Sequence, residues 1–282
     1  MDLEVIDYVN TNLIAVKMHA DSVGVKDLIE HYKISEFPTI VFVDKDGTEI
    51  DRIIGYLPSD KFLKELKRIQ SGVGTIPNLI IKTKNIPSKF ETWMKLASKY
   101  EDRGDLKSAT EVWESVAEAG LGNEEFVNYK LIELHGFINK DVIDLEYFIA
   151  DNLNSEYAQY AFQSVISILR KNNNQVEEAD AWRRYINLME LKKMYTPSLY
   201  NSFAWRMSEL ELNLEEALEK IRIGIGMIAE EDTSNLAGYM DTEAEVLWKM
   251  GNIDKAVEVI DNCIALQPDD KYFKDQKAKF LE

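Results

Sequence analysis

Apolar and polar residues follow two different patterns along this chain, and the change falls near residue 70. Before it, short continuous apolar runs such as PTIVFV at residues 38–43 predict strands that are covered on both faces. After about residue 88, apolar residues recur every three or four positions, which predicts amphipathic helices. The chain is therefore expected to hold an α/β region followed by an all-α region, with helix in the majority.

The first region is expected to form a mixed sheet with helices around it. Its elements in order are a helix in residues 2–10, a strand at 13–18, a helix at 25–34, a strand at 38–43, the hairpin turn DKDG at 44–47, a returning strand within 48–57 and a helix from residue 58. Gly47 suits the turn because glycine adopts positive φ without steric cost. Pro58 and Ser59 are typical of a helix start.

Residues 71–87 are interpreted as a linker, because they contain two glycines, two prolines and no helical period. Beyond residue 87 a short sequence motif recurs five times. Its apolar position falls at Leu106, Val142, Val176, Leu214 and Ile253, with spacings of 36, 34, 38 and 39 residues. Three residues later stand Ala109, Leu145, Ala179, Ala217 and Ala256. This period predicts stacked helix pairs, which cross closely where a small side chain lies.

The predicted division is thus residues 1–70, a linker at 71–87, and a helical repeat domain at 88–282. The last region would contain five helix pairs and a capping helix formed by KYFKDQKAKFL.

The charge of the chain excludes some partners. Against 33 Lys and Arg residues stand 50 Asp and Glu residues, a net charge of −17. A nucleic acid would be repelled by this field, and no basic stripe stands out. No apolar run approaches the roughly twenty residues that cross a bilayer, so no membrane insertion is expected. A protein or peptide remains as the expected partner.

Little in the sequence points to catalysis. The single cysteine, Cys263, excludes an internal disulfide and a thiolate zinc site, and we expect it to be a buried apolar residue. His19, His31 and His135 have no metal-ligand spacing, and no acid–base pair is defined by spacing. We therefore expect no catalytic residue, no metal site and no cofactor in this chain.

Aromatic residues at helical spacing have two interpretations in the second region. The set is Trp93, Tyr100, Trp113, Tyr160, Trp182, Tyr185, Trp205 and Trp248. Most are expected to pack between helices, while some could line a concave groove that holds an extended peptide. In that second case Lys95, Lys99, Arg183 and Arg184 would bind acidic groups of the peptide.

The first seventy residues resemble the C-terminal two-thirds of a thioredoxin-like domain. The segments that carry the resemblance are LIAVKMHAD, VKDLIEHYKI, the EFPT loop, DKDG and DRIIGYLP. The resemblance is closest to bacterial cell-envelope proteins of this family. It implies a cis peptide bond between Phe37 and Pro38, and a groove lined by Phe37, Pro38 and Thr39 where a substrate or partner chain binds.

The second region resembles the tetratricopeptide (TPR) pattern, most clearly in residues 88–120 and 236–270. Trp93, Leu96, Ala97, Tyr100 and Gly104 carry the first match. The repeats between these two segments are longer and less regular, so the region is called TPR-like.

The resemblance to thioredoxin-like domains lacks the first strands and the C-x-x-C motif. Thiol–disulfide exchange requires a thiolate and a resolving sulfur, so redox catalysis is not expected from this chain. A missing central strand would leave two apolar strand edges unpaired. Three explanations stay open, namely a natural precursor with a longer N-terminus, a sheet that closes on itself, and a strand from a partner. We favour the first, and the free edges also allow self-association.

The resemblance implies a thioredoxin-like protein of thiol–disulfide redox or protein-folding pathways, in which the helical repeats bind a protein. The alternative is a non-catalytic TPR-like scaffold with a degenerate thioredoxin-fold docking module. Whether the natural protein is an enzyme stays open. The resemblance implies the bacterial periplasm or cell envelope if a signal peptide precedes this sequence, and the cytoplasm otherwise.

Overall fold

The computed structural model describes residues 2–229 and 231–282, and the chain divides into two compact units. The first extends to Asn139 and the second runs from Lys140 to Glu282. Residue 1, where the predicted thioredoxin-like domain begins, lies outside the described residues.

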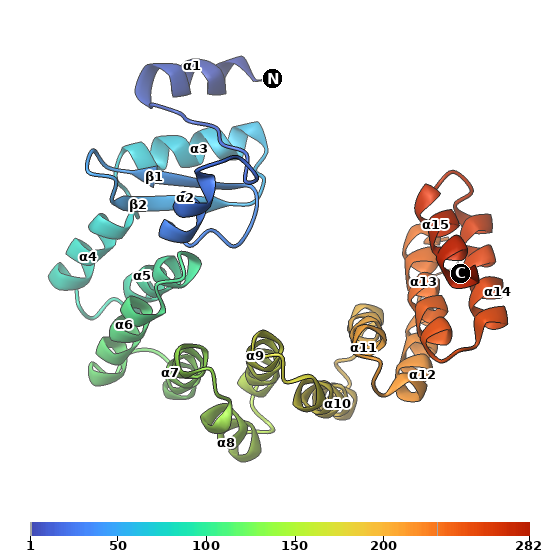
Figure 1. Cartoon of the computed structure of the whole chain (residues 1–282). Coiled ribbons are helices and arrows are strands. Elements are labelled where there is room, and N and C mark those ends of the chain that lie inside the picture. The colour runs from blue at the N-terminus through green and yellow to red at the C-terminus, as the bar shows by residue number, and fades with distance from the viewer. Residues whose placement is uncertain (1, 230) are drawn as a thin grey trace. The chain divides into compact units, whose positions relative to one another are not determined.

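The first unit combines a small sheet with helices (Figure 1). Its elements are α1 (Leu3–Asn12), α2 (Val25–His31), β1 (Thr39–Val43), β2 (Glu49–Ile54), α3 (Ser59–Gln70), α4 (Ile76–Asn85), α5 (Phe90–Asp102), α6 (Leu106–Glu118) and α7 (Glu124–Asn139). The side chain of Asp2 caps α1 by accepting hydrogen bonds from the next turn, as Asp does at many helix starts.

The sheet of the first unit is an antiparallel hairpin. Thr39 lies opposite Ile54 and Phe42 lies opposite Asp51, with an irregularity in register after Phe42. The turn is closed by Asp44, whose Oδ1 accepts hydrogen bonds from the N–H groups of Asp46 and Thr48 at 2.9 Å. Gly47 has a φ of 79°, as the turn pattern predicts. In Figure 1 the strands lie between α2 in front and α3 behind.

The expected strand at residues 13–18 is wrong. In the described residues the sheet contains only β1 and β2, so it is purely antiparallel and not the mixed sheet that the pattern suggested. A strand forms only when a neighbour supplies hydrogen bonds along its edge. Residues 13–18 have the short apolar run of a strand but no strand beside them among the described residues, and their backbone stays irregular.

The expectation of a linker without helix at residues 71–87 is also wrong, because α4 lies inside it. Pro77 sits in the first turn of α4, where its missing N–H does no harm. Ile76 and Leu79 are buried in one cluster with Leu96 of α5 and Val112 of α6. α4 is therefore packed against the first helix pair. The proposed domain boundaries themselves stay a prediction.

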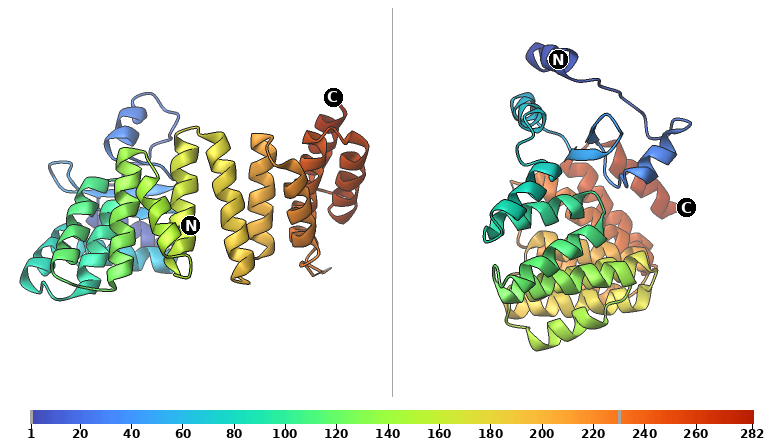
Figure 2. Two further views of the ribbon diagram at one scale, coloured as in Figure 1. Left: turned by 90° about the horizontal axis from the view of Figure 1, so that it is seen from below. Right: turned by 90° about the vertical axis from the view of Figure 1, so that its left-hand side faces the viewer.

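The second unit is all-helical. It contains α8 (Ile143–Asp151), α9 (Tyr157–Lys171), α10 (Gln175–Leu191), α11 (Pro197–Leu210), α12 (Leu214–Ile225), α13 (Thr233–Lys249), α14 (Ile253–Leu266) and α15 (Lys271–Leu281). Figure 2 shows α9–α12 side by side and roughly antiparallel. Each copy of the recurring motif lies at the start of the second helix of a predicted pair. The small or apolar residue three positions after the motif's first apolar residue is buried in every copy, at Ala109, Leu145, Ala179, Ala217 and Ala256. Helices lie where the five predicted pairs require them. The helices of four pairs (α5–α6, α9–α10, α11–α12 and α13–α14) pack against each other, and α15 packs on α14 as the capping helix.

A buried carboxylate joins three helices of the second unit. Glu178 of α10 is fully buried and accepts hydrogen bonds from Arg206 of α11 at 2.7 Å and from Arg170 of α9 at 3.0 Å. Burial alone would raise the pKa of Glu178, but the hydrogen bonds from Arg206 and Arg170 hold it below its ordinary value. Paired in this way, a buried charge fixes which helix faces meet.

Every helix in the described part of the chain falls short of the length and apolar character that crossing a bilayer requires.

The capping helix α15 covers a second buried carboxylate, and this one is incompletely paired. Asp241 of α13 is 5% exposed, and its Oδ2 accepts a hydrogen bond from the Tyr272 hydroxyl at 3.0 Å. Its Oδ1 is buried without a partner among the described residues. Burial, with a smaller contribution from the charge of Glu245, raises the pKa of Asp241 to about 6 against the lowering effect of the Tyr272 hydrogen bond.

The raised pKa of Asp241 predicts a pH dependence of stability. The folded chain holds the Asp241 proton more tightly than the unfolded chain does, so the free energy of unfolding falls as the pH rises from about 4 to 6. We expect Asp241→Asn to raise the free energy of unfolding by about 2 kcal/mol at pH 7.5 and to change it little at pH 4. Urea unfolding at both pH values measures this. Asp275→Asn, on the exposed side of α15, is the matched control, and equal pH profiles for wild type and Asp241→Asn would refute the assignment.

Candidate functional site

The loop before β1 presents one exposed aromatic ring on a fixed backbone. The Phe37–Pro38 peptide bond is cis, as the resemblance implied. Thr39 Oγ1 donates to the carbonyl of Glu36 at 2.6 Å, and the N–H of Gly55 donates to the carbonyl of Pro38 at 2.8 Å. The Phe37 side chain is 64% exposed. The three predicted partner-binding residues therefore lie together where a partner chain can reach them, and their binding role stays a prediction.

One edge of β1 lies open beside this loop. In an antiparallel pair, alternate residues bond the neighbouring strand and the others point their N–H and C=O groups away. The bond between Gly55 and Pro38 sets the phase, so Ile40 and Phe42 bond β2 while Thr39 and Val41 face the opposite edge. No strand of the described chain covers that edge.

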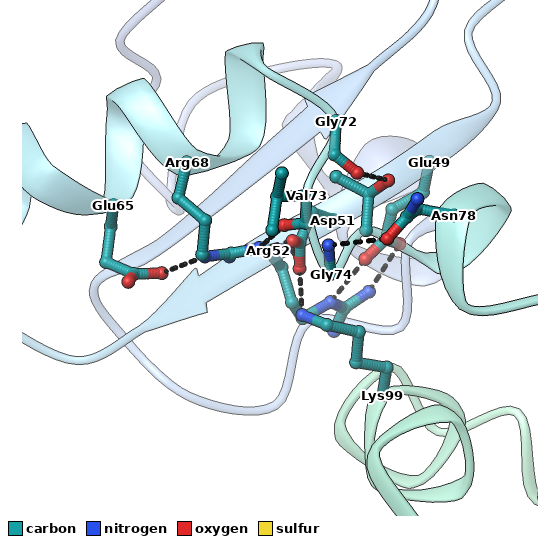
Figure 3. A network of polar contacts seen from close by, with 11 residues as sticks. Glu49, Asp51, Arg52, Glu65, Arg68, Gly72, Val73, Gly74, Asn78 and Lys99 are labelled. Carbon is teal, nitrogen blue, oxygen red and sulfur yellow. Dashed lines mark hydrogen bonds and ion pairs between the residues drawn. The ribbon is translucent and has the colours of Figure 1, made fainter. Parts of the chain in front are cut away.

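One face of β2 is held by a buried carboxylate (Figure 3). Asp51 of β2 is 1% exposed, and its Oδ2 accepts a hydrogen bond from Arg68 of α3 at 2.8 Å. Its Oδ1 accepts bonds from Lys99 of α5 and from the N–H of Arg52. Arg68 also bonds Glu65 and the carbonyl of Val73. The carboxylate thus ties the sheet to α3 and to the first helix pair.

The opposite face of β2 makes a second set of ties to the helices. Arg52 binds Glu49 through two nitrogens, at 2.6 and 2.7 Å, and donates to the carbonyl of Tyr32 at 2.7 Å and to that of Asp102 at 3.1 Å. Lys33 donates to the carbonyl of Gly104 at 3.0 Å. The end of α2, the hairpin and the end of α5 are therefore joined, and they enclose a polar pocket of about 410 Å³.

Nothing in the sequence singled out Asp51 among so many carboxylates. The one available signal is its position in the strand, because Asp51 faces the same side as the buried Ile53 two residues later. A charged residue on the buried side of a strand requires an ion-pair partner. The pattern of the strand does not identify Lys99, which is 48 residues away.

The second unit contains a mostly apolar groove between α8, α9 and α10, with a volume of about 530 Å³. Arg184 lies at its rim and is held by Glu146 through two hydrogen bonds of 2.7 Å. Arg183 bonds Glu216 at 2.5 Å, and Lys99 bonds Asp51. These three cations, which the sequence offered as ligands for acidic groups of a peptide, are already paired within the chain.

Most of the aromatic set packs between helices, in line with the first of its two interpretations. Trp113 and Tyr185 are buried, and Trp93, Tyr100, Trp182 and Trp248 are partly buried against the apolar clusters. Tyr160 is 44% exposed.

The cysteine is inaccessible. Cys263 is fully buried, and its Sγ donates to the carbonyls of Ala237 and Val259 at 3.4 Å. Burial, followed by the charge of Asp241, raises the pKa of this thiol to about 12. The expectation of a buried apolar residue is confirmed. In the described part of the chain, no three His, Cys, Asp or Glu side chains are grouped to hold a metal ion.

Residues 7–70 match a family model described as a thioredoxin-like domain. Among solved structures, the chain is similar to the TPR-like repeats of a putative kinesin light chain from Podosopora anserina, with 14% identity and a TM-score of 0.49 over 64% of this chain and 96% of that one. YrrB, a TPR protein with an unusual peptide-binding site, shows 15% identity and a TM-score of 0.45 over 71% and 97%. No curated protein matches the sequence.

The buried carboxylate Asp51 yields a prediction for stability. Asp51→Asn removes the charge that pairs with Arg68 and Lys99, so we expect a loss of about 2 kcal/mol in the free energy of unfolding. Urea unfolding followed by tryptophan fluorescence measures it. Asp46→Asn, in the exposed hairpin turn, should change stability by less than about 0.5 kcal/mol. A variant at Asp51 as stable as this control would contradict the network.

The burial of Cys263 yields a prediction for reactivity. The thiol should react with a disulfide reagent such as dithionitrobenzoate at least about a hundredfold more slowly in the folded chain than in guanidinium chloride, because both access and thiolate fraction are low. Absorbance at neutral pH follows the reaction. Full labelling of the native chain within the mixing time would show that Cys263 is exposed.

Proposed function

We propose that this chain, a thioredoxin-like domain followed by TPR-like helix pairs, binds extended polypeptides in a thiol–disulfide redox or protein-folding pathway. The observation that carries the proposal is the exposed ring of Phe37, on a loop held in place by the hydrogen bonds of Thr39 and Pro38. An exposed aromatic ring on an ordered loop offers apolar contact to an extended chain.

Side-chain contacts with α3 and α5 hold the hairpin that carries the proposed binding surface. Asp51 and Arg52 connect the hairpin to α3 and to α5, so the strand is held in place before any partner arrives. A site that is ordered in advance loses less conformational entropy on binding than a flexible loop does.

This chain is proposed to contribute binding and no thiol chemistry of its own. Cys263 is its single thiol, and that thiol is buried with a raised pKa. In a mixture of insulin and dithiothreitol, addition of the chain should leave the rate of insulin reduction unchanged. An acceleration that disappears in Cys263→Ala would show that Cys263 is a reactive thiol and would contradict the proposal directly. An acceleration that persists in this variant would contradict it less directly.

The second candidate is a non-catalytic TPR-like scaffold whose thioredoxin-fold part is a degenerate docking module. The pairing of Lys99, Arg183 and Arg184 within the chain favours it, because these cations are then not free to bind acidic groups of an extended peptide. The two candidates differ in whether an unfolded chain binds near Phe37.

The test uses α-lactalbumin that has been reduced and carboxymethylated, so that it stays unfolded, with the native protein as comparison. We expect the unfolded form to bind in a fluorescence anisotropy titration, and Phe37→Ala to weaken binding about tenfold or more, as loss of an aromatic anchor does. Tyr147→Ala, on exposed α8, is the matched control. No binding of the unfolded form, or equal losses in both variants, would favour the scaffold.

A further inference from the structure

We propose that the apolar groove between α8, α9 and α10 binds an amphipathic α-helix of a partner protein. The bound helix is about two to three turns long, with apolar residues along one face and an acidic residue in its first turn. This site belongs to the second unit and uses neither Phe37 nor its loop, so it goes beyond the proposed function.

Two side-chain ties between the α8 segment and α10 frame the groove. At one end Arg184 donates two hydrogen bonds of 2.7 Å to Glu146, and its guanidinium lies 5.5 Å from the centre of the Phe162 ring. At the other end the Nζ of Lys192 donates to the carbonyl of Ser155 at 2.6 Å. The two ties follow the same order along both helices, so α8 and α10 run parallel. The rise from Arg184 to Lys192 gives the groove a length of about 12 Å.

The floor of the groove is apolar and buried, while its sides are exposed. Ile149 of α8, Phe162 of α9 and Leu188 of α10 are buried and form the floor. Figure 1 shows α9 above and between the other two helices. Leu153 and Leu191 also line the groove, and they are 48% and 83% exposed. Exposed apolar side chains that gather around an apolar groove are typical of a binding site.

The walls of the groove favour a helix over an extended chain. The backbone N–H and C=O groups within α8 and α10 are bonded inside each helix, so an extended chain would find few backbone partners along these walls. A helix satisfies its own backbone and needs only apolar side-chain contact from the groove.

The exposed sides favour a helix over a single acyl chain. A helix with its side chains is about 10 Å across, so it can contact Leu153 and Leu191 together while its apolar residues reach the floor. An acyl chain on the floor would leave most of Leu191 in water. Apolar residues at positions i, i+4 and i+7 span about 10 Å along a helix, which fits the length of the groove.

One cation at the end of the groove sets the charge and direction of the bound helix. Glu146 and Arg184 pair with each other, whereas Lys192 has no carboxylate within ion-pair distance among the described residues. α8 and α10 both end near Lys192, with the negative ends of their dipoles. A helix that begins there brings its positive dipole end and an acidic residue of its first turn to the ammonium. It therefore runs antiparallel to α8 and α10.

The charge of the chain disfavours a second copy as the occupant. Each copy has a net charge of −17, so two copies repel each other. A partner helix whose charges balance meets no such repulsion.

The test uses three fluorescein-labelled, alanine-rich peptides. The first has leucine at i, i+4 and i+7, glutamates in its first turn, lysines in its last turn and a lactam bridge that holds the helix. The second has glutamine in place of the glutamates, and the third has a central proline in place of the bridge. In anisotropy titrations at physiological salt we expect the glutamate peptide to bind with a Kd below about 100 µM, the glutamine peptide about threefold more weakly and the proline peptide at least about tenfold more weakly.

Variants of the chain test where the peptide binds. Leu191→Ala should weaken binding of the glutamate peptide about tenfold, because it removes one side of the groove. Leu281→Ala changes another exposed leucine of the second unit and is the matched control. Lys192→Gln should weaken the glutamate peptide about threefold and leave the glutamine peptide unchanged, and Lys255→Gln on exposed α14 should affect neither.

Two further measurements support the variants. Circular dichroism checks that each variant is folded. Methyl NMR of the wild-type chain reports on the groove without a substitution, and the signals of Leu153 and Leu191 should shift when the glutamate peptide is added, while that of Leu281 should not.

Several results would overturn the inference. They are no binding of the glutamate peptide, equal losses in Leu191→Ala and Leu281→Ala, a proline peptide that binds as tightly as the helical one, and equal effects of Lys192→Gln on the glutamate and glutamine peptides. Dodecanoate that binds through Leu191 when the peptides fail would assign the groove to a small amphiphile. A dimer in light scattering that Leu191→Ala converts to a monomer would assign it to a second copy.

Discussion

A β-strand carries hydrogen-bonding groups along two edges, and β1 uses only one of them within the described chain. This single constraint accounts for the character of the first unit. The hairpin has too few strands to bury its own apolar side chains, so Phe37, Ile40 and Val43 remain between 38% and 64% exposed. The segment at residues 13–18 has a strand-like sequence and stays irregular for the same reason.

Such a small sheet needs support from outside itself, and the helices provide it. A two-stranded hairpin alone is marginally stable in water. Here α3 covers one face, and Lys99 of α5 reaches the buried carboxylate of Asp51. α4 follows α3 in the chain and packs Ile76 and Leu79 into the core of the first helix pair. The thioredoxin-like residues and the start of the helical array therefore share one compact unit.

The sequence predicts most elements of this chain because their signals are local. The hairpin follows from DKDG between two apolar runs, and the helix pairs follow from the recurring position that holds Ala109 and Ala256. The errors arise where the outcome depends on distant residues. Residues 13–18 needed a neighbouring strand, and α4 was hidden by Pro77, which is harmless at a helix start.

The candidate site could be foreseen only in part. Phe37, Pro38 and Thr39 were identified from the resemblance to thioredoxin-like domains, and their loop is exposed with the cis bond that the resemblance implied. The tie between Asp51 and Lys99 could not be foreseen, since it joins residues 48 positions apart in two different kinds of structure. The pairing of Arg183 and Arg184 with carboxylates of other helices was hidden in the same way.

Amide hydrogen exchange in β1, resolved residue by residue by NMR, tests the central claim most directly. If one edge is open, the N–H groups of Ile40 and Phe42 exchange slowly, while those of Thr39 and Val41 exchange rapidly in the free chain. Slow exchange at all four residues in the free, monomeric chain would show that the edge is already covered and would contradict the account.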